Sequence, residues 1–232
     1  MSIAEKFEVI ADAVYDKGKK DFEDLFAKGF TYNGARTYYS YAFRATSFNA
    51  DNIIDFKGLC KPTEATQMFY NTKGTHLPIG IDMSNIDVSN QTVIDQLFSY
   101  NSKLLEIPDF NIPATKRIYH TYSYCYALHT IHGKVRVNAD TTYTQPFREN
   151  NALQNIEIEG TIGQNGFNVK DCTKLSKASL LSILTALSND SSVASGKSIT
   201  FATVHKDIIE GDSQCLEQYN LAISAGWTIA YA

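Results

Sequence analysis

FSYNSKLLEI at residues 98–107, YSYCYALHTI at 122–131 and FRENNALQNI at 147–156 are three copies of one pattern. Each copy reads aromatic-x-x-(Asn or Cys)-x-x-Leu-x-x-Ile, and Val169, Cys172 and Leu175 fill the first three positions of a fourth copy. Counting the less regular matches at Ile53 and Leu77, the Leu position recurs every 22 to 27 residues from 53 to 175. This spacing is typical of leucine-rich repeats.

The pattern predicts a short strand and a turn in each copy. Leu and Ile three residues apart, followed by a further apolar residue, indicate a strand whose alternate side chains face a core. The Asn or Cys lies where the chain turns into that strand; a buried Asn there can hydrogen-bond neighbouring copies, and Cys fills the same volume. The aromatic residue belongs to a layer that packs over the strand, and we expect short helices over 63–69 and 89–98 to supply that layer. Stacked aromatic residues then account for an aromatic content of 12%.

The pattern resembles the BspA-like (Treponema-type) leucine-rich repeat, whose unit reads Ala-Phe-x-x-Cys-x-x-Leu-x-x-Ile-x-Ile-Pro. The stretches that carry the resemblance are Ala42-Phe43, Leu97-Phe98 through Ile107-Pro108, and Tyr124-Cys125 through Ile131. Most copies lack the Ile-x-Ile-Pro ending. The resemblance implies an α/β fold, a short leucine-rich-repeat solenoid over residues 31–175 with an N-terminal helix and a C-terminal α/β cap.

Both ends of the chain resemble repeat proteins encoded in the tail regions of phages and prophages. The stretches concerned are 3–7 and 14–20 at the N-terminus, and 175–187 and 225–229 near the C-terminus. This second resemblance implies a structural or receptor-binding role in a phage tail.

Residues 1–30 form a separate N-terminal segment. Ile3, Phe7, Ile10 and Val14 follow one another at spacings of four, three and four, which predicts a helix with an apolar seam of two heptads. A free helix of that length is marginal in water. The seam therefore either caps the open end of the repeat core or docks, joining copies of the chain or attaching them to a larger assembly.

Residues 176–232 are predicted to cap the other end, because the last unit of a solenoid would otherwise expose its core. A helix begins after Ser176 or Ser179, either of which is a suitable N-cap. A strand over 198–202, a helix over about 214–225 and a last strand over 227–231 follow. The apolar face of the first helix consists of Leu180, Leu181, Ile183, Leu184 and Leu187.

Composition narrows the possible partners and compartments. The formal net charge of −4 argues against nucleic-acid binding through bulk positive charge. The N-terminus has no apolar signal core, and no stretch approaches the length of a membrane span, so we expect neither a signal peptide nor membrane insertion. The four cysteines, Cys60, Cys125, Cys172 and Cys215, form no C-x-x-C pair and are expected to be reduced thiols.

The sequence carries no recognised catalytic signature. His120, Cys125, His129 and His132 are the one cluster of metal-ligand residue types, but the Cys-x3-His-x2-His spacing is not a usual zinc arrangement. We expect surface histidines there instead of a metal site. The glycines at 160, 163 and 166 fit a turn between repeats and not a phosphate loop. The expectation is a non-enzymatic protein without cofactor or metal.

A solenoid usually binds its partner on an extended face. The candidate binding residues lie beside the core positions of the strands or among the tyrosines near 120: Asp55, Lys57, Glu106, Tyr119, Tyr124, Thr130, His132, Asn155, Glu157 and Glu159.

The predicted function is that of a phage tail-associated structural or receptor-binding protein, made in the host cytoplasm and carried in the virion. It would assemble as a homo-oligomer such as a trimer, contact other tail proteins through the N-terminal helix, and bind a host surface protein or glycan. Two alternatives stay open: a bacterial leucine-rich-repeat module for adhesion or protein interaction, and an enzyme of unrecognised type.

Overall fold

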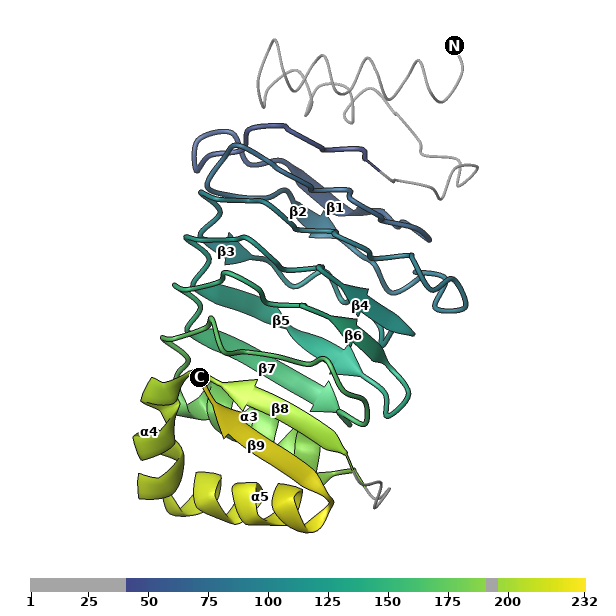
Figure 1. The fold of residues 1–232 in the computed structure, drawn as a ribbon. Coiled ribbons are helices and arrows are strands. Elements are labelled where there is room, and N and C mark those ends of the chain that lie inside the picture. The colour runs from purple at the N-terminus through teal and green to yellow at the C-terminus, as the bar shows by residue number, and fades with distance from the viewer. Residues whose placement is uncertain (1–40, 191–195) are drawn as a thin grey trace, which may run out of the picture.

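The computed structural model describes residues 41–190 and 196–232. These residues form a mixed α/β fold, in which short parallel strands lie one beside the next along the molecule and the helices lie at the C-terminal end (Figure 1). The predicted N-terminal helix, with Ile3, Phe7, Ile10 and Val14, lies outside the described residues.

All the named strands of the described chain pair in parallel, and from β3 to β7 each strand pairs with the next strand but one in the sequence. The parallel pairs are β1 (Asp55–Cys60) with β2 (Ile79–Ile81), β3 (Glu106–Ile107) with β5 (Thr130–Val137), β5 with β7 (Asn155–Gly160), and β4 (Arg117–Tyr119) with β6 (Thr142–Thr144). Glu106 is level with Thr130, and Thr130 with Asn155. The strands predicted at the three clear copies are confirmed in β3, β5 and β7.

We use the word unit for the chain from one aromatic position to the next. The aromatic positions form one buried column, Phe43, Phe69, Phe98, Tyr122 and Phe147. Successive ring centroids are 5.4, 5.8, 5.6 and 5.2 Å apart, and the ring planes differ by 19° or less. Each ring is at most 6% exposed, so the rings bury a large apolar surface against one another along the column. The predicted stacking of aromatic residues is confirmed.

The layer that carries this column consists of turns, and the expectation of short helices over 63–69 and 89–98 is wrong. Around Phe98, the N–H groups of Gln96, Phe98 and Tyr100 donate at 2.8–3.0 Å to carbonyl oxygens of the corresponding turn around Tyr122. Gln96 and Tyr100 have φ of 52° and 64°. A helix would direct these N–H groups along its own axis, whereas the left-handed residues turn them toward the neighbouring unit.

The Asn/Cys position supplies a second bond between units. Each of these side chains donates to the carbonyl of the aromatic residue one unit earlier: Asn101 to Phe69 (2.9 Å), Cys125 to Phe98 (3.1 Å), Asn150 to Tyr122 (2.7 Å) and Cys172 to Phe147 (3.7 Å). The Asn150 Oδ1 also accepts from the Cys125 N–H at 2.9 Å. The predicted role of a buried Asn at this position is therefore confirmed.

The C-terminal residues pack onto the last unit. The elements are α3 (Lys177–Ser188), β8 (Lys197–Phe201), the 3-10 helix η1 (Thr203–His205), α4 (Lys206–Gly211), α5 (Ser213–Ser224) and β9 (Trp227–Tyr231). Ser176 caps α3 by accepting from the Ser179 N–H at 3.3 Å, as predicted. The two predicted strands are confirmed as the parallel pair β8 and β9, and the second predicted helix as α5. The sequence did not predict η1 or α4.

All four cysteines are buried, and none is disulfide-bonded. Burial raises the pKa of the Cys125 thiol to about 12, and it also raises the pKa of Cys172 and Cys215. These thiols therefore pack as small apolar groups. Within the described ranges, no helix has the length and apolar character that crossing a membrane requires.

Replacing Asn150 with Ala is expected to destabilise the fold by about 2–4 kcal/mol, because the Cys125 N–H and the Tyr122 carbonyl would both lose their buried partner. Asn150→Cys should cost roughly half as much, since a thiol already donates to the corresponding carbonyl at Cys125 and Cys172. Urea unfolding measures both, with the exposed neighbour Asn151→Ala as the control. Equal losses for the Ala and Cys variants would contradict this account of the position.

His205 makes stability depend on pH. It is 1% exposed, and neither ring nitrogen has a hydrogen-bond partner among the described residues. Burial lowers the pKa of His205 below 6.5. Above about pH 7.5 the ring is neutral in both the folded and the unfolded chain, so protonation does not affect stability there. Stability falls as the pH drops through about 6.5 toward the lowered native pKa, because only the unfolded chain then takes up the proton.

The expected loss is at most about 1.4 kcal/mol per pH unit for this single proton. Urea midpoints of the wild type and of His205→Leu, measured at about pH 7.5 and about pH 5.5, test this expectation. The variant should lose less stability than the wild type between the two pH values. Parallel pH profiles of the two proteins would show that His205 does not carry the effect.

Candidate functional site

The outward side chains of β3, β5 and β7 form one continuous polar surface, which we call the strand face. Glu106, Thr130 and Asn155 make one row across the three strands, and the Asn155 Nδ2 donates to the Thr130 Oγ1 at 3.2 Å. Lys134 is level with Glu157, and Arg136 with Glu159. Six of the ten predicted binding residues lie on this face: Glu106, Thr130, His132, Asn155, Glu157 and Glu159.

An irregularity in β5 places His132 over Glu106. Between the pairs Thr130–Asn155 and Lys134–Glu157, β5 contains two more residues than β7. The extra stretch includes Gly133, where a Cβ would lie 2.6 Å from the Asp109 Oδ1, so a larger residue there would displace the Asp109 side chain. The His132 Nε2 lies 2.7 Å from the Glu106 Oε2.

Three histidines favour the charged form of the Glu106 carboxylate. The hydrogen bond with His132 is the main cause of a lowered pKa at Glu106, and the charges of His132, His129 and His76 add to it. The His129 Nδ1 lies 3.9 Å from the Glu106 Oε1. As predicted, His129 and His132 lie outward while Cys125 is fully buried. No three ligand residues of the described chain are grouped so that they could hold a metal ion.

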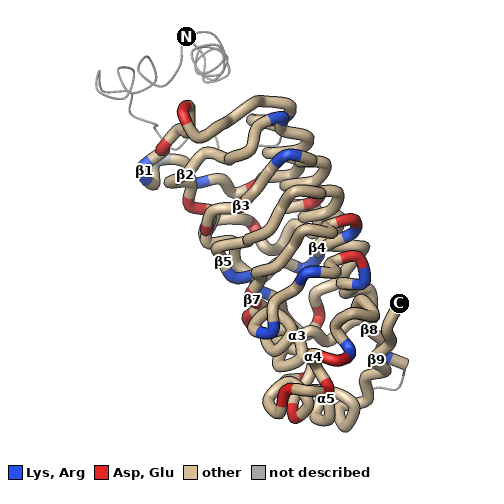
Figure 2. Tube along the Cα trace, turned by 90° about the vertical axis from the view of Figure 1, so that its left-hand side faces the viewer, with Lys and Arg blue, Asp and Glu red and all other residues tan. Residues whose placement is uncertain are grey.

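Ion pairs cross the other half of the strand face. The Lys134 Nζ lies 3.3 Å from both the Glu157 Oε1 and the Glu159 Oε2, and the Arg136 Nε lies 3.5 Å from the same Glu159 oxygen. Hydrogen bonds with the two glutamates raise the pKa of Lys134. Figure 2 shows basic and acidic residues interleaved along the molecule. Exposed pairs of this kind contribute little to stability and leave their polar atoms accessible to a partner.

The other four predicted binding residues lie elsewhere. Asp55 and Lys57 belong to β1, which pairs with β2 and not with the three-stranded sheet. The Asp55 Oδ1 accepts from the Lys57 N–H at 2.8 Å, so this carboxylate is bonded to the backbone of its own strand. Tyr119 lies in β4, and Tyr124 lies in the turn layer, so neither is part of the strand face.

Tyr124 belongs to a tyrosine row on the outside of the turn layer. The ring centroids of Tyr70 and Tyr100 are 5.2 Å apart, and those of Tyr100 and Tyr124 are 4.4 Å apart. The Arg44 guanidinium lies 4.8 Å from the Tyr70 ring centre at one end, and that of Arg148 lies 5.4 Å from the Tyr124 ring centre at the other. Neighbouring groups therefore cover the ring faces, and only the ring edges remain for contact.

The sequence analysis missed this row as a feature. Its signal is a tyrosine one or two residues after the aromatic position, at 70, 100 and 124. The Tyr100 and Tyr124 rings stack, and the Tyr70 ring meets Tyr100 at a tilt of 47°, so the row also joins neighbouring units from the outside.

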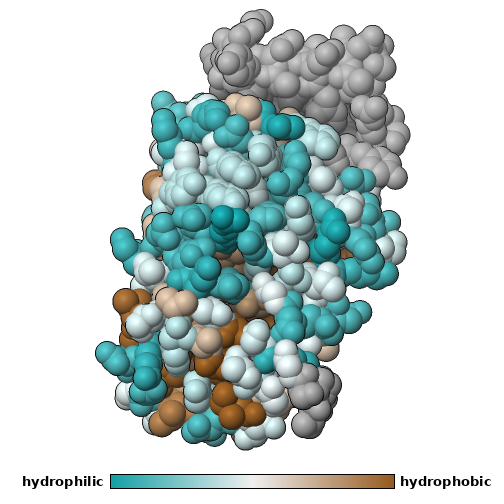
Figure 3. All heavy atoms as spheres, viewed as in Figure 1, coloured by the Kyte–Doolittle hydropathy of each residue, from teal (hydrophilic) through white to brown (hydrophobic). Residues whose placement is uncertain are grey.

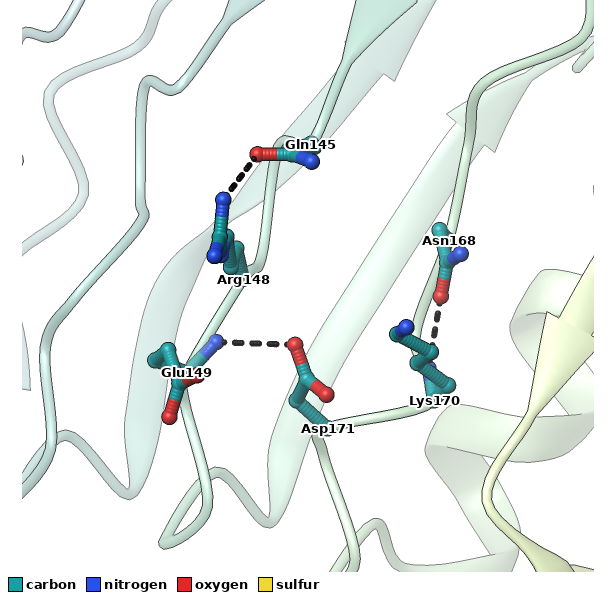
Figure 4. A pocket seen from close by; sticks show the side chains of 6 residues that line it. All are labelled: Gln145, Arg148, Glu149, Asn168, Lys170 and Asp171. Carbon is teal, nitrogen blue, oxygen red and sulfur yellow. Dashed lines mark hydrogen bonds between the residues drawn. The ribbon is translucent and has the colours of Figure 1, made fainter. Parts of the chain in front are cut away.

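A shallow pocket of about 220 Å³ lies where the tyrosine row ends (Figure 4). The side chains that line it are all polar: Gln145, Arg148, Glu149, Asn168, Lys170 and Asp171. Arg148 donates to the Gln145 Oε1 at 2.9 Å, and the Glu149 N–H donates to the Asp171 Oδ2 at 3.1 Å. Its two cations and two carboxylates balance, so the pocket favours neither a polyanion nor an apolar ligand. No pattern in the sequence predicted this pocket.

No family model, curated protein or solved structure matches the chain.

Proposed function

We propose that the chain is a leucine-rich-repeat solenoid of the BspA-like kind that acts as a non-enzymatic binding module. In this proposal residues 31–175 are the solenoid, residues 176–232 are its C-terminal cap, and residues 1–30 are the docking segment. The support for the solenoid is the register. Strands 24 or 25 residues apart lie side by side in parallel, and the aromatic and Asn/Cys positions form continuous columns.

The main support for a binding function is that side chains of the strand face line up in rows across the strands. Parallel pairing brings outward side chains from separate units level with one another, as it does for Glu106, Thr130 and Asn155. A surface built from many units suits an extended macromolecular partner better than a small molecule. The partner we propose is a host surface protein or glycan, and the setting is a phage tail, for which the support is the resemblance of the two chain ends to tail-region repeat proteins.

Charge reversal on the strand face tests the binding function. The variant Glu157→Lys/Glu159→Lys places two more cations beside Lys134 and Arg136, and we expect adsorption of the purified chain to host cells to fall at least about tenfold. A panel of bacterial strains is screened first with the wild type, using whole cells, protease-treated cells and isolated surface polysaccharide. The exposed Asp140→Lys is the matched control.

Loss of adsorption only after protease treatment would identify a protein receptor, and binding to the polysaccharide alone would identify a glycan. Unchanged adsorption by the double variant would place the binding surface elsewhere. Failure of the wild type to bind any strain would contradict the receptor-binding role.

Ile10→Asp tests the docking segment. A charge in the apolar seam should lower the solution mass of the full chain, as measured by light scattering, while the thermal unfolding of the remaining fold stays unchanged. Loss of the fold instead would show that the segment is a cap of the repeat core. An unchanged mass together with an intact fold would remove the support for docking.

A further inference from the structure

The hydrogen bonds between turns stop at the turn around Phe147. In each of the four preceding turns, three N–H groups donate to carbonyl oxygens of the next turn at 2.7–3.1 Å. The corresponding groups here belong to Gln145, Phe147 and Glu149. The Glu149 N–H donates to the Asp171 carboxylate at 3.1 Å, and within the described ranges the N–H groups of Gln145 and Phe147 have no hydrogen-bond partner. Backbone donors in a packed layer require an acceptor, and here a group from outside the chain can supply one.

The interruption has a cause in the shape of the backbone. Every turn of the aromatic column has left-handed residues two before and two after the ring, and at the last ring these are Gln145 and Glu149, with φ of 45° and 61°. The next stretch of the chain is centred on Val169, and neither Phe167 nor Asp171 has a positive φ. The two stretches therefore do not mesh, and the polar pocket of about 220 Å³ lies between them (Figure 4).

Side chains of the pocket are held in place by the chain itself. The Arg148 guanidinium donates to the Gln145 Oε1 at 2.9 Å and lies 5.4 Å from the Tyr124 ring centre. The Asp171 carboxylate is fixed by the Glu149 N–H. A site whose polar groups are positioned in advance loses less conformational freedom when a ligand binds.

Other polar groups of the pocket are available to a ligand. Among the described residues, the Lys170 ammonium and the Glu149 carboxylate form no hydrogen bond or ion pair, and both line the pocket. The Gln145 N–H is a further free donor. The pocket thus offers donors and acceptors together, and its two cations and two carboxylates leave it without net charge.

These groups favour an uncharged ligand that is rich in hydroxyl groups. A hydroxyl both donates and accepts, so it can donate to the carboxylates and accept from the cations. A sugar ring carries several hydroxyls. The volume of about 220 Å³ is smaller than that of sites for drug-sized molecules, which suits a single ring rather than a chain. The surface of the stacked units is largely hydrophilic in Figure 3, so the units offer a ligand hydrogen bonds more than apolar contact.

We propose that this pocket binds one sugar residue of a neutral glycan. The pocket is formed by residues 145–149 and 168–171 and is separate from the strand face. Sugar binding here therefore does not depend on the role proposed for the strand face. It gives the glycan partner of the proposed function a defined point of contact on the turn layer.

Amide NMR spectra of the full chain, recorded during addition of a sugar, test the proposal. The probes are the methyl glycosides of glucose, galactose, mannose and N-acetylglucosamine, each titrated separately. At least one should give saturable shifts with a dissociation constant on the order of 1 mM, because a shallow site contacts few ligand atoms. The shifts should be confined to residues 145–149 and 168–171 and should include the Gln145 amide, since a ligand oxygen then accepts from its N–H.

A double variant tests which side chains bind the sugar. Glu149→Gln/Lys170→Met removes one charge of each sign from the pocket, so the net charge is unchanged while hydrogen-bonding groups are lost. We expect the dissociation constant to rise at least about tenfold. The control Lys206→Met/Glu210→Gln makes the same two changes at an exposed ion pair on α4 and should bind as the wild type does. Thermal unfolding checks that both variants are folded; if the pocket variant is not, the position of the wild-type shifts decides.

Several results would overturn the proposal. One is the lack of a saturable shift with all four sugars, and another is a set of shifts centred on the strand face. Equal loss of affinity in the pocket variant and the control would show that the shifts do not report binding in the pocket. Free glycine is a further probe, because two cations and two carboxylates can also pair with a zwitterion. A response to glycine and to no sugar would replace the sugar with a zwitterionic ligand.

Discussion

The backbone hydrogen bonds between turns of neighbouring units are the constraint on which the structure depends. A chain that stacks its units must satisfy its N–H and carbonyl groups on the side away from the strands as well. Here, residues two before and two after each aromatic position adopt positive φ, for example Gln67 and Asn71 around Phe69. Such non-glycine residues cost about 1 kcal/mol or more each. The bonds to the next unit, together with the buried ring that they enclose, offset that cost and fix the spacing at which strands, polar column and tyrosine row all stack.

The sequence predicted those parts of the fold that repeat side-chain chemistry. The Leu and Ile positions predicted β3, β5 and β7, and Ser176 predicted the start of α3. The turn layer could not be predicted in the same way, because its left-handed residues are Gln, Asn, Tyr, His, Glu and Ala, which share no side-chain property. The early units also differ from the pattern in their local packing. Phe48 is fully buried beside Gly74, where a Cβ would lie 1.9 Å from the Phe48 carbonyl oxygen, and Ile53 is only half-buried.

The candidate site was predictable only in part, because a list of outward residues does not say which sheet carries them. Glu106, Thr130 and Asn155 lie side by side because their strands pair in register. Asp55 and Lys57 were also predicted from their place beside core positions, but their strand belongs to another sheet. The approach of His132 to Glu106 depends on two extra residues in β5, and the repeat pattern of the sequence does not predict them. The two faces also differ in chemistry: the strand face presents exposed charged groups in ion pairs, and the turn face presents tyrosine rings in contact with one another.

The unequal lengths of the units show where this architecture tolerates change. Successive aromatic positions are separated by 24 to 29 residues, yet the spacing between the two left-handed residues around each ring is always four. The variation is therefore absorbed outside the turn layer, as in the longer β5. Insertions and deletions at the strand ends can reshape the strand face without disturbing the turns that hold the stack. One face of this fold can thus change in length and charge while the backbone that supports it keeps its spacing.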